Sequence, residues 1–590
     1  MGLWKPIGDG EWVGSDVSEK FPVYTRGNAG EVYPEVFTPL SFSIASEIGE
    51  KAMRNAVLGT GLIAASEFED KPLSTGIANG VFGGYAYLNL SMQRLLAARI
   101  PGGNASDADV TIFGVGQEIP PHESIDGEKN FMAGLRGLRY VWRVVRTREI
   151  PLLGEDQAKV ATYLGSLGDP TAAGDDELAN AATDELMTMF EGLFQHHLEV
   201  TAGASTAVSL LTQICDKQLG DPNLAVRLLA GLGDVDSAAP SLALWDLSRL
   251  VNANPALAAR FDAGIDDALW PAVQADPSAA EFADAFRSFL AAFGSRGPNE
   301  WDTAFDTWET KPALAMVLVD RMRAADESHD PHTQLTRLAK ESAELEVETR
   351  ARIKRPIRPI FDRVLAAARV WSRGRERSKT TVVLAIHGSR LRAKELDRRL
   401  VERSGGTAGD LWYLTSDELD AYVADPASFA DTIAERRRVH AELDARVPPF
   451  AFSGQLPPLE TWDRKIDLRG TISVGESIVG LPGCPGIARG RARVVTDPGD
   501  PNGLEPGDVL IAPITDPSWT PLFIPAEAVV VDVGAVMSHA VIVSRELGIP
   551  CAVSVAGATL RIPDGALVEV DGSTGRVTVL ELAPDTIEHT

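Results

Sequence analysis

A serine and a histidine lie at the start of an apolar segment near the end of the chain. Ser538 and His539 open SHAVIVSRELG, whose periodicity predicts a helix that ends at Gly548, with Pro550 just beyond. The first turn of a helix offers unpaired backbone N–H groups and the positive end of the helix dipole, which stabilise a phosphate. A neutral imidazole is a competent nucleophile near pH 7. This pattern therefore suits a histidine that accepts a phosphoryl group and passes it on.

The same two residues also allow a purely structural interpretation. Ser538 is a good helix N-cap in any protein, and His539 could simply face solvent beside it. If a phosphate is present, the Ser538 hydroxyl could cap the helix or donate to that phosphate. The local residues alone leave both interpretations open.

The segments around this histidine predict a compact β/α domain over residues 481–582. Short β-branched runs alternate with turns in ARVV, DVLIAPI, AVVVDVG and CAVSV, and LVEVDGSTGRVTVL predicts a hairpin. The Pro- and Gly-rich stretch 447–480 lacks periodicity, which predicts a flexible linker before this domain.

The rest of the chain predicts a mainly helical region. Residues 151–446 repeat apolar residues at three- and four-residue intervals, as in DELMTMFEGLFQHHLEV and IRPIFDRVLAAARVW. Residues 1–150 mix loops and helices, and we expect them to form the N-terminal part of the same helical substrate domain. The expected fold class is therefore multidomain: helices first, then a C-terminal β/α domain.

The C-terminal segments resemble the swivelling phosphohistidine domain (β/β/α) of the phosphoenolpyruvate-utilising enzyme family. The resemblance is carried in order by PGIARGRARVV, PGDVLIAPITDPSWTPLF, SHAVIVSRELGIP and DGALVEVDGSTGRV. It implies that His539 is the phosphorylated histidine. Two residues depart from the family pattern: Ala535 replaces the second of two glycines, and Met537 stands where a small or polar residue is common. Both would reshape the turn that presents the histidine.

Within this resemblance, TDPSWTPLF is most similar to the rifampin phosphotransferases and the two-component aryl phosphate synthases. Pro517 and Pro521 predict a rigid loop, and Trp519 is an apolar anchor. We expect a packed loop beneath the histidine.

A basic island, ARVWSRGRERSKTT, stands out in the central region. Arg375 and Lys379 are four residues apart, so they project together from a helix, and a phosphoryl group between them would offset their repulsion. A solvated basic face partly neutralised by Glu376 is the alternative. A similar R-E-x-x-K helix assists transfer in the rifampin phosphotransferases, and the resemblance implies a catalytic role for Arg375 and Lys379.

Two further segments resemble the central domain of the same enzymes. In FGSRGPNEWD, Ser295 replaces a histidine that is common there, and Arg296 with Glu300 predicts an ion pair that holds a helix start or contacts substrate. In TRGNAGEVYPEVFTPLSFS, Phe42 lies close to a position where the rifampin enzymes have a polar side chain. If the positions correspond, the acceptor differs.

Other histidines and apolar residues favour structural roles. His196-His197 and His329-x-x-His332 have metal-compatible spacing but no accompanying cluster of ligands, so no metal site is predicted. The stripe Met187, Phe190 and Phe194 has helical spacing and predicts core, with an apolar acceptor pocket as the alternative.

Composition and charge exclude several classes of protein. The 590 residues are 44% hydrophobic and carry 83 acidic against 56 basic residues, a net charge of −27. This balance argues against non-specific nucleic-acid binding and against docking on anionic membranes. The three cysteines are widely spaced and predict no disulfide framework. We expect a reduced, cytoplasmic protein without nucleic-acid or membrane partners.

The resemblance also implies how the histidine is loaded. We recognise no ATP-grasp-like region and no G-x-x-x-x-G-K-[ST] loop, and the chain ends too soon after 582 for the pyruvate-binding barrel of phosphoenolpyruvate synthases. We therefore expect this chain to bind no cofactor, and ATP and Mg²⁺ to be bound by a separate ATP-grasp subunit. This arrangement resembles the phenylphosphate and 4-cresol phosphate synthases, which phosphorylate a phenolic hydroxyl. A split rifampin-type antibiotic phosphotransferase and a non-catalytic phosphohistidine carrier are the alternatives.

Overall fold

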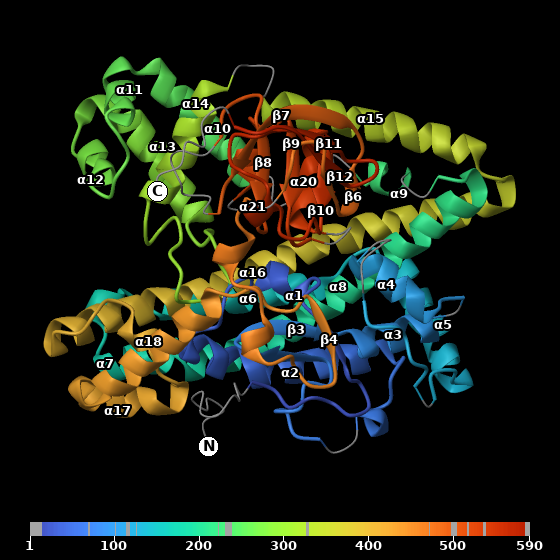
Figure 1. Ribbon diagram of the computed structural model, residues 1–590, viewed down its shortest axis with the longest axis horizontal. Coiled ribbons are helices and arrows are strands. Elements are labelled where there is room, and N and C mark those ends of the chain that lie inside the picture. Colours follow the sequence, from blue (N-terminus) through green and yellow to red (C-terminus); the bar gives the residue numbers. More distant parts are fainter. Residues whose placement is uncertain are drawn as a thin grey trace.

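The computed structural model describes residues 14–68, 71–100, 102–113, 119–125, 127–221, 224–229, 239–325, 330–470, 472–496, 504–515, 519–534 and 538–583. Figure 1 shows the C-terminal domain, in orange and red, lying above the long helix α16 (Arg358–Ser404), with the N-terminal part, in blue, below. No helix within the described ranges combines the length and apolarity that crossing a membrane requires.

A small sheet joins the start of the chain to a distant segment. Its order is β2 (Asn79–Phe82), β3 (Tyr85–Asn89), β1 (Val23–Thr25) and β4 (Ala451–Ser453), and all its pairs are antiparallel. Residues 1–150 were expected to hold loops and helices, so the three strands in this region were missed. Strands β2 and β3 form a local hairpin closed by Gly83 and Gly84, but the short strand β1 is fixed only by its pairing with β3 and with the distant β4.

The prediction that residues 447–480 form a flexible linker is wrong for most of this stretch. Strand β4 pairs with β1, and Phe452 and Trp462 are buried in the cluster that also holds Tyr24 and Phe82. Further on, Ile472 is buried in the C-terminal core, and β5 (Ser477–Val479) pairs with β12 (Arg576–Glu581). Pro and Gly content predicted flexibility, but the aromatic side chains between them pack against a sheet. The connection between the two packed parts is therefore short.

The helical region is organised around two long helices, as the periodicity predicted. Helix α8 (Asp184–Leu219) packs along α16, and α2 (Pro39–Thr60) packs on α8. At Gly203 of α8 a Cβ atom would lie 2.5 Å from the ring of Trp371, so glycine permits this close approach. Helix α14 (Ala313–Ala324) also lies in the region 151–446 that was predicted to be helical.

The other helices complete this region. In chain order they are α1 (Ala29–Val32), α3 (Leu90–Arg99), α4 (Ala105–Phe113), α5 (Phe131–Arg146), α6 (Pro151–Ser166), α7 (Asp175–Ala182), α9 (Leu224–Arg227), α10 (Ala239–Ala253), α11 (Pro255–Asp262), α12 (Leu269–Gln274), α13 (Ala280–Phe293), α15 (Pro331–Arg352), α17 (Leu419–Ala424) and α18 (Ala430–Asp444).

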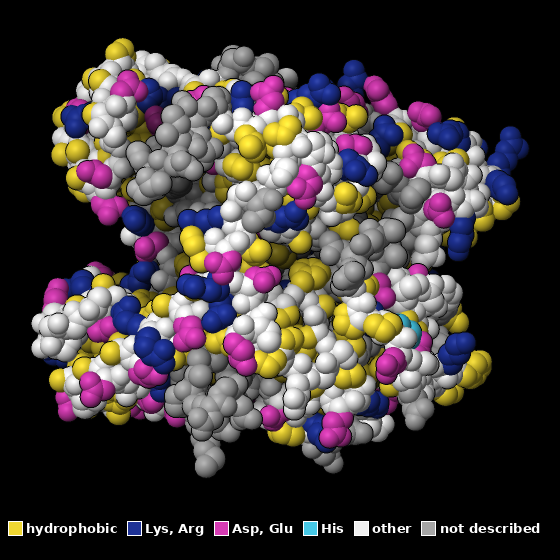
Figure 2. All heavy atoms as spheres, in the orientation of Figure 1, with side chains coloured by type: hydrophobic (Ala, Val, Ile, Leu, Met, Phe, Trp, Pro, Cys, Tyr) yellow, Lys and Arg dark blue, Asp and Glu magenta, His cyan; other side chains and the backbone are white. Residues whose placement is uncertain are grey.

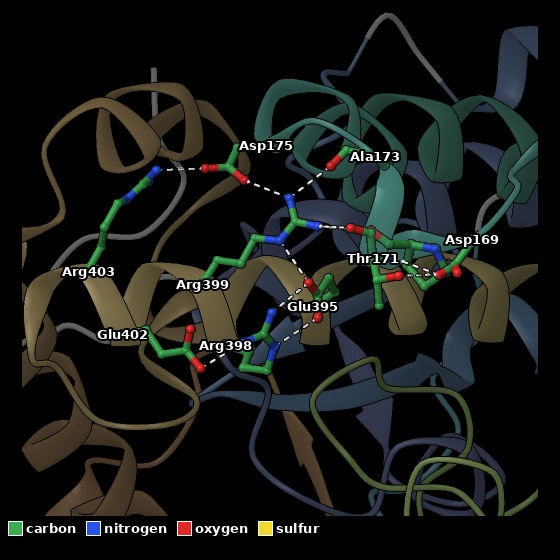
Figure 3. Close-up of polar contacts among 10 residues, drawn as sticks. Asp169, Thr171, Ala173, Asp175, Glu395, Arg398, Arg399, Glu402 and Arg403 are labelled. Atoms are coloured by element: carbon green, nitrogen blue, oxygen red, sulfur yellow. Dashed lines mark hydrogen bonds and ion pairs between the residues drawn. The ribbon is translucent and has the colours of Figure 1, made fainter.

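Ion pairs fix the C-terminal half of α16. Arg399 contacts Glu395 at 2.7 Å and Asp175 at 3.1 Å, and it donates to the carbonyl oxygen of Ala173 at 2.8 Å. Arg403 contacts the second oxygen of Asp175 at 2.7 Å. Figure 3 shows these arginines reaching from α16 to the segment that leads into α7. The helix that carries Arg375 and Lys379 is thus held at its far end by half-buried and exposed charges.

The C-terminal domain is a single sheet covered by short helices. The strand order is β5-β12-β11-β7-β8-β9-β10-β6, in which β7, β8, β9 and β10 are parallel. The remaining bounds are β6 (Leu481–Cys484), β7 (Ile487–Val494), β8 (Val509–Ala512), β9 (Ala528–Val531), β10 (Cys551–Val553) and β11 (Leu567–Asp571), with α20 (His539–Leu547) and α21 (Ala558–Arg561). The predicted hairpin (β11 and β12) and the predicted helix (α20) are confirmed.

Successive side chains of β8 and β9 point to opposite faces of the sheet and pack into two separate cores. Leu510 and Val529 face one side of the sheet, and Val509 and Val530 face the other. The first side shares its core with α10, α13 and α14 of the helical region, and the short helix α19 (Thr520–Phe523) contacts α10 and α14. The C-terminal domain is therefore packed against the helical region through apolar residues.

Candidate active site

His539 is the first residue of α20, and two hydroxyls hold its ring. Ser538 is the N-cap, and its Oγ accepts a hydrogen bond from the N–H of Val541 at 3.4 Å. Nε2 of His539 lies 3.0 Å from Oγ1 of Thr520, and Nδ1 lies 3.2 Å from Oγ1 of Thr515. A neutral imidazole has one donor and one acceptor nitrogen, so one threonine accepts and the other donates. The ring orientation is thereby fixed at both nitrogens.

The two threonines were missed at the sequence level. TDPSWTPLF was interpreted as a packed loop, and Trp519 is indeed buried. Its first and sixth residues, however, place their hydroxyls on the histidine. Hydroxyl residues in a Pro-rich segment are a weak signal, because only the fold brings Thr515 and Thr520 to the ring of His539. Pro517, Ala535 and Met537 lie outside the described residues.

The surroundings of His539 favour the neutral ring. Burial lowers its pKa well below the usual value, and the positive charges of Lys379, Arg296 and Arg375 lower it further. His539 is half-buried, and its ring stands edge-on to that of Phe523, with 6.0 Å between ring centroids. A neutral imidazole keeps the lone pair that a phosphoryl acceptor needs.

The cations come from the helical region opposite the histidine. Buried Glu300 accepts from Arg296 at 2.9 Å and pairs with Lys379 at 3.3 Å, and Arg296 also donates to Thr380 at 2.7 Å. Arg375 lies one turn before Lys379 on α16, and its contact with Glu376 is long, at 3.9 Å. Figure 2 shows Lys and Arg side chains on both sides of the seam between the C-terminal domain and the region below it.

Six residues singled out in the sequence are thus brought together: His539, Ser538, Arg375, Lys379, Arg296 and Glu300. The predicted ion pair is present, and it also holds Lys379. Lys379, Arg296 and Arg375 all act on the neutral ring of His539, and positive charge at such a place stabilises a phosphoryl group in transfer.

Phe42 is placed elsewhere. It is buried with Phe37 and Val81 in a small cluster of its own. The neighbouring Ser41 instead lines a pocket, where its hydroxyl bonds to buried Asp302. The pocket is lined by Tyr33, Phe37, Ser41, Ile44, Ala45, Leu186, Phe190, Trp301, Thr303 and Ile386.

This pocket adjoins the cationic cluster through Trp301, the residue after Glu300. Phe190 of the predicted stripe lines it, and Phe194 stacks on Phe190 with centroids 5.0 Å apart. Phe190 therefore packs in the hydrophobic core and also lines the aromatic pocket. The cavity measures about 20 Å³, which is room for about one water molecule.

The histidines with metal-compatible spacing have other partners. His196 pairs with Asp156 at 2.9 Å, His197 contacts the hydroxyl of Ser378 at 2.9 Å, and His332 pairs with Asp246 at 3.0 Å. His329 lies outside the described residues. Within the described part of the chain, no three His, Cys, Asp or Glu side chains gather closely enough to hold a metal ion.

Two family models match the segments that form this site. Residues 504–575, which include His539, match the mobile domain of PEP-utilising enzymes. Residues 196–376, which include Arg296 and Arg375, match the fourth domain of rifampicin phosphotransferase. The resemblance to the phosphoenolpyruvate-utilising enzymes is confirmed.

Whole-chain relatives are longer than this chain. An uncharacterized protein of Mycobacterium tuberculosis is 29% identical over 588 residues, which cover 96% of this chain and 63% of that protein. The prodigiosin synthesizing transferase of Serratia marcescens is 25% identical, covering 96% of this chain and 64% of its own length. Rifampicin phosphotransferase of Streptomyces sviceus is 29% identical, covering 62% of this chain and 42% of its own length. This chain thus spans under two thirds of each.

Proposed function

We propose that this chain is a phosphotransferase in which His539 carries a phosphoryl group to a small hydroxyl acceptor. The observation that carries the proposal is the neutral ring of His539, held by Thr515 and Thr520 and facing Lys379, Arg296 and Arg375. The matches to rifampicin phosphotransferase and to the mobile domain support phosphoryl transfer as the type of reaction.

The acceptor we propose is a phenol, such as phenol or 4-cresol. The lining of the aromatic pocket supports this class, because Tyr33, Phe190 and Trp301 offer flat apolar walls while Ser41 and Thr303 offer hydroxyls. The cavity of about 20 Å³ must widen to admit a phenol ring. Arg375 and Lys379 would stabilise the charge on the phosphoryl oxygens as the bond from nitrogen breaks and the bond to oxygen forms.

We propose that ATP and Mg²⁺ are bound by a separate ATP-grasp subunit, in the cytoplasm, and that the dikinase-type reaction loads His539 there. The C-terminal domain would then swing between that subunit and the helical region. The short connection between Trp462 and Ile472 is the segment we expect to act as hinge, because the chain is packed on either side of it. The packing of the domain on α10, α13 and α14 corresponds to the acceptor end of that cycle.

A second candidate is an antibiotic phosphotransferase of the rifampin type, which the match over 196–376 favours. It uses the same histidine and the same cations but a larger acceptor. A carrier without an acceptor of its own would use His539 alone. The three functions differ in what happens after loading, so the test must separate loading from transfer.

The test loads the histidine without any partner. Phosphoramidate phosphorylates imidazole nitrogen: its P–N bond breaks, ammonia leaves, and a new P–N bond forms to the ring. We expect peptide mass spectrometry to place the phosphoryl group on His539, and the loaded chain to form phenyl phosphate when phenol is added. The His539→Ala chain should form none. Loading at another residue, or a loaded chain that gives its phosphoryl group only to rifampicin or only to water, would contradict the proposal.

A further inference from the structure

We propose that His197 is the base that takes the proton from the acceptor hydroxyl during transfer. This inference rests on the proposed function, since it assigns a role in that same reaction. His197 was weighed at the sequence level only as a metal ligand, but the fold places it between the aromatic pocket and the cations that face His539.

The contacts of His197 fix which nitrogen is available. Its Nδ1 lies 2.9 Å from Oγ of Ser378, and that hydroxyl donates its single hydrogen to the carbonyl oxygen of Arg375 at 2.9 Å. Ser378 can therefore only accept from His197, so Nδ1 carries the proton. The other nitrogen, Nε2, then holds a free lone pair. None of the described residues makes a hydrogen bond to it.

His197 lies near both the aromatic pocket and the cations that act on His539. Its ring lies 5.7 Å from that of Trp301, which lines the pocket, and 6.4 Å from that of Phe194. The positive charges of Arg375 and Lys379 lower the pKa of His197, as they lower the pKa of His539. A phosphoryl group beside those cations would thus lie near both His539 and His197.

The electrostatics keep His197 unprotonated until a phosphoryl group arrives. Burial, then the charges of Arg375 and Lys379, lower its pKa to about 3. The ring is therefore neutral in the empty site. A phosphoryl group bearing two negative charges offsets the two cations and makes the ring more basic at the moment when a proton must be taken up.

The step balances without any other reactant. The acceptor oxygen forms a bond to phosphorus as the P–N bond of phosphorylated His539 breaks. The hydroxyl proton passes to Nε2 of His197. The ring of His539 leaves with the electron pair of the P–N bond and takes up a proton from solvent, and His197 later returns its own proton to solvent. The aryl phosphate and two neutral imidazoles remain.

The test compares two acceptors that differ only in whether a base is needed. Phenol holds its proton at pH 8 and para-nitrophenol has largely lost it, so only phenol requires His197. In the His197→Asn chain the amide can still donate to Ser378, but the lone pair of Nε2 is gone. We expect transfer from the loaded chain to phenol to fall by about 100-fold or more, and transfer to para-nitrophenol to change by less than about threefold.

The matched control is His196→Asn on the same helix, whose side chain pairs with Asp156 instead. It should leave the ratio of the two rates unchanged. An equal loss with both phenols in His197→Asn would overturn the inference and assign His197 a packing role, and no loss with either would overturn it outright. The proposed function fails separately, if the unaltered loaded chain transfers to neither phenol.

Discussion

His539 differs from an ordinary surface histidine in what surrounds its ring. Two threonine hydroxyls fix both nitrogens, and three cations lower the pKa of the ring beyond the effect of burial. The N-cap and the helix could be predicted from SHAVIVSRELG, because a cap and its helix are local in sequence. The threonines could not, because the contact depends on how the fold brings Thr515 and Thr520 beside the first residue of α20.

The lowered pKa predicts how loading depends on pH. An imidazole with an ordinary pKa is increasingly protonated below about pH 6.5 and loses its nucleophile. Because the pKa of His539 is held well below that value, the ring stays neutral as the pH falls from 7 to 5. We expect the rate of loading by phosphoramidate, divided by the rate for free imidazole at the same pH, to rise over this range. A constant ratio would show an ordinary histidine.

The two threonines are predicted to orient the ring during loading. Replacing Thr515 or Thr520 with valine removes one hydrogen bond, worth about 0.5–1.5 kcal/mol, and keeps the shape of the side chain. We expect loading by phosphoramidate to slow by about threefold to tenfold in each variant, measured by mass spectrometry over time. Unchanged loading in both variants would mean that the hydroxyls do not orient the nucleophile.

We predict that the cations act in the second step of the proposed reaction. Lys379→Ala and Arg375→Ala remove positive charge from beside His539, where we propose that the phosphoryl group passes to the acceptor. We expect transfer from the loaded chain to phenol to fall by about 100-fold in each, since one preorganised contact to developing charge has that effect. Loading itself should change little. A variant that loads slowly and then transfers at the normal rate would reverse this assignment.

At the scale of elements, α8 and α16 position most of the site. Arg375, Lys379 and Ser378 lie on α16, and His197 lies on α8. Both helices were predicted from their periodicity. Their mutual packing was not, because it depends on a close approach at one glycine, which periodicity does not reveal.

Gly203 is predicted to be essential for that approach. Gly203→Ala puts a Cβ atom 2.5 Å from the ring of Trp371, whose indole N–H is held by the carbonyl oxygen of Val144 at 3.0 Å. We expect a loss of about 1–3 kcal/mol in the free energy of unfolding, measured with urea. Gly192→Ala, on the same helix, meets nothing within 4 Å and should gain up to about 1 kcal/mol. Equal effects would contradict the packing described.

At the scale of the whole molecule, the site exists only where two parts meet. The nucleophile lies on the C-terminal domain, and the cations and the pocket lie on the helical region. The C-terminal domain could be predicted, since its strands and hairpin are local. The sheet formed by β1 and β4 could not, since it joins residues more than 400 positions apart, as in the pairing of Val23 with Ser453. That pairing ties the segment once expected to be a free linker to the start of the chain.

The proposal that His539 carries the phosphoryl group is tested most directly by isotope exchange. The chain is incubated with phenyl phosphate and deuterium-labelled phenol, without ATP or any partner, and the label in phenyl phosphate is followed by mass spectrometry. A histidine that takes the phosphoryl group from one phenol and gives it to another predicts steady exchange, and none in His539→Ala. Exchange that persists in His539→Ala, or no exchange in the unaltered chain, would contradict the account.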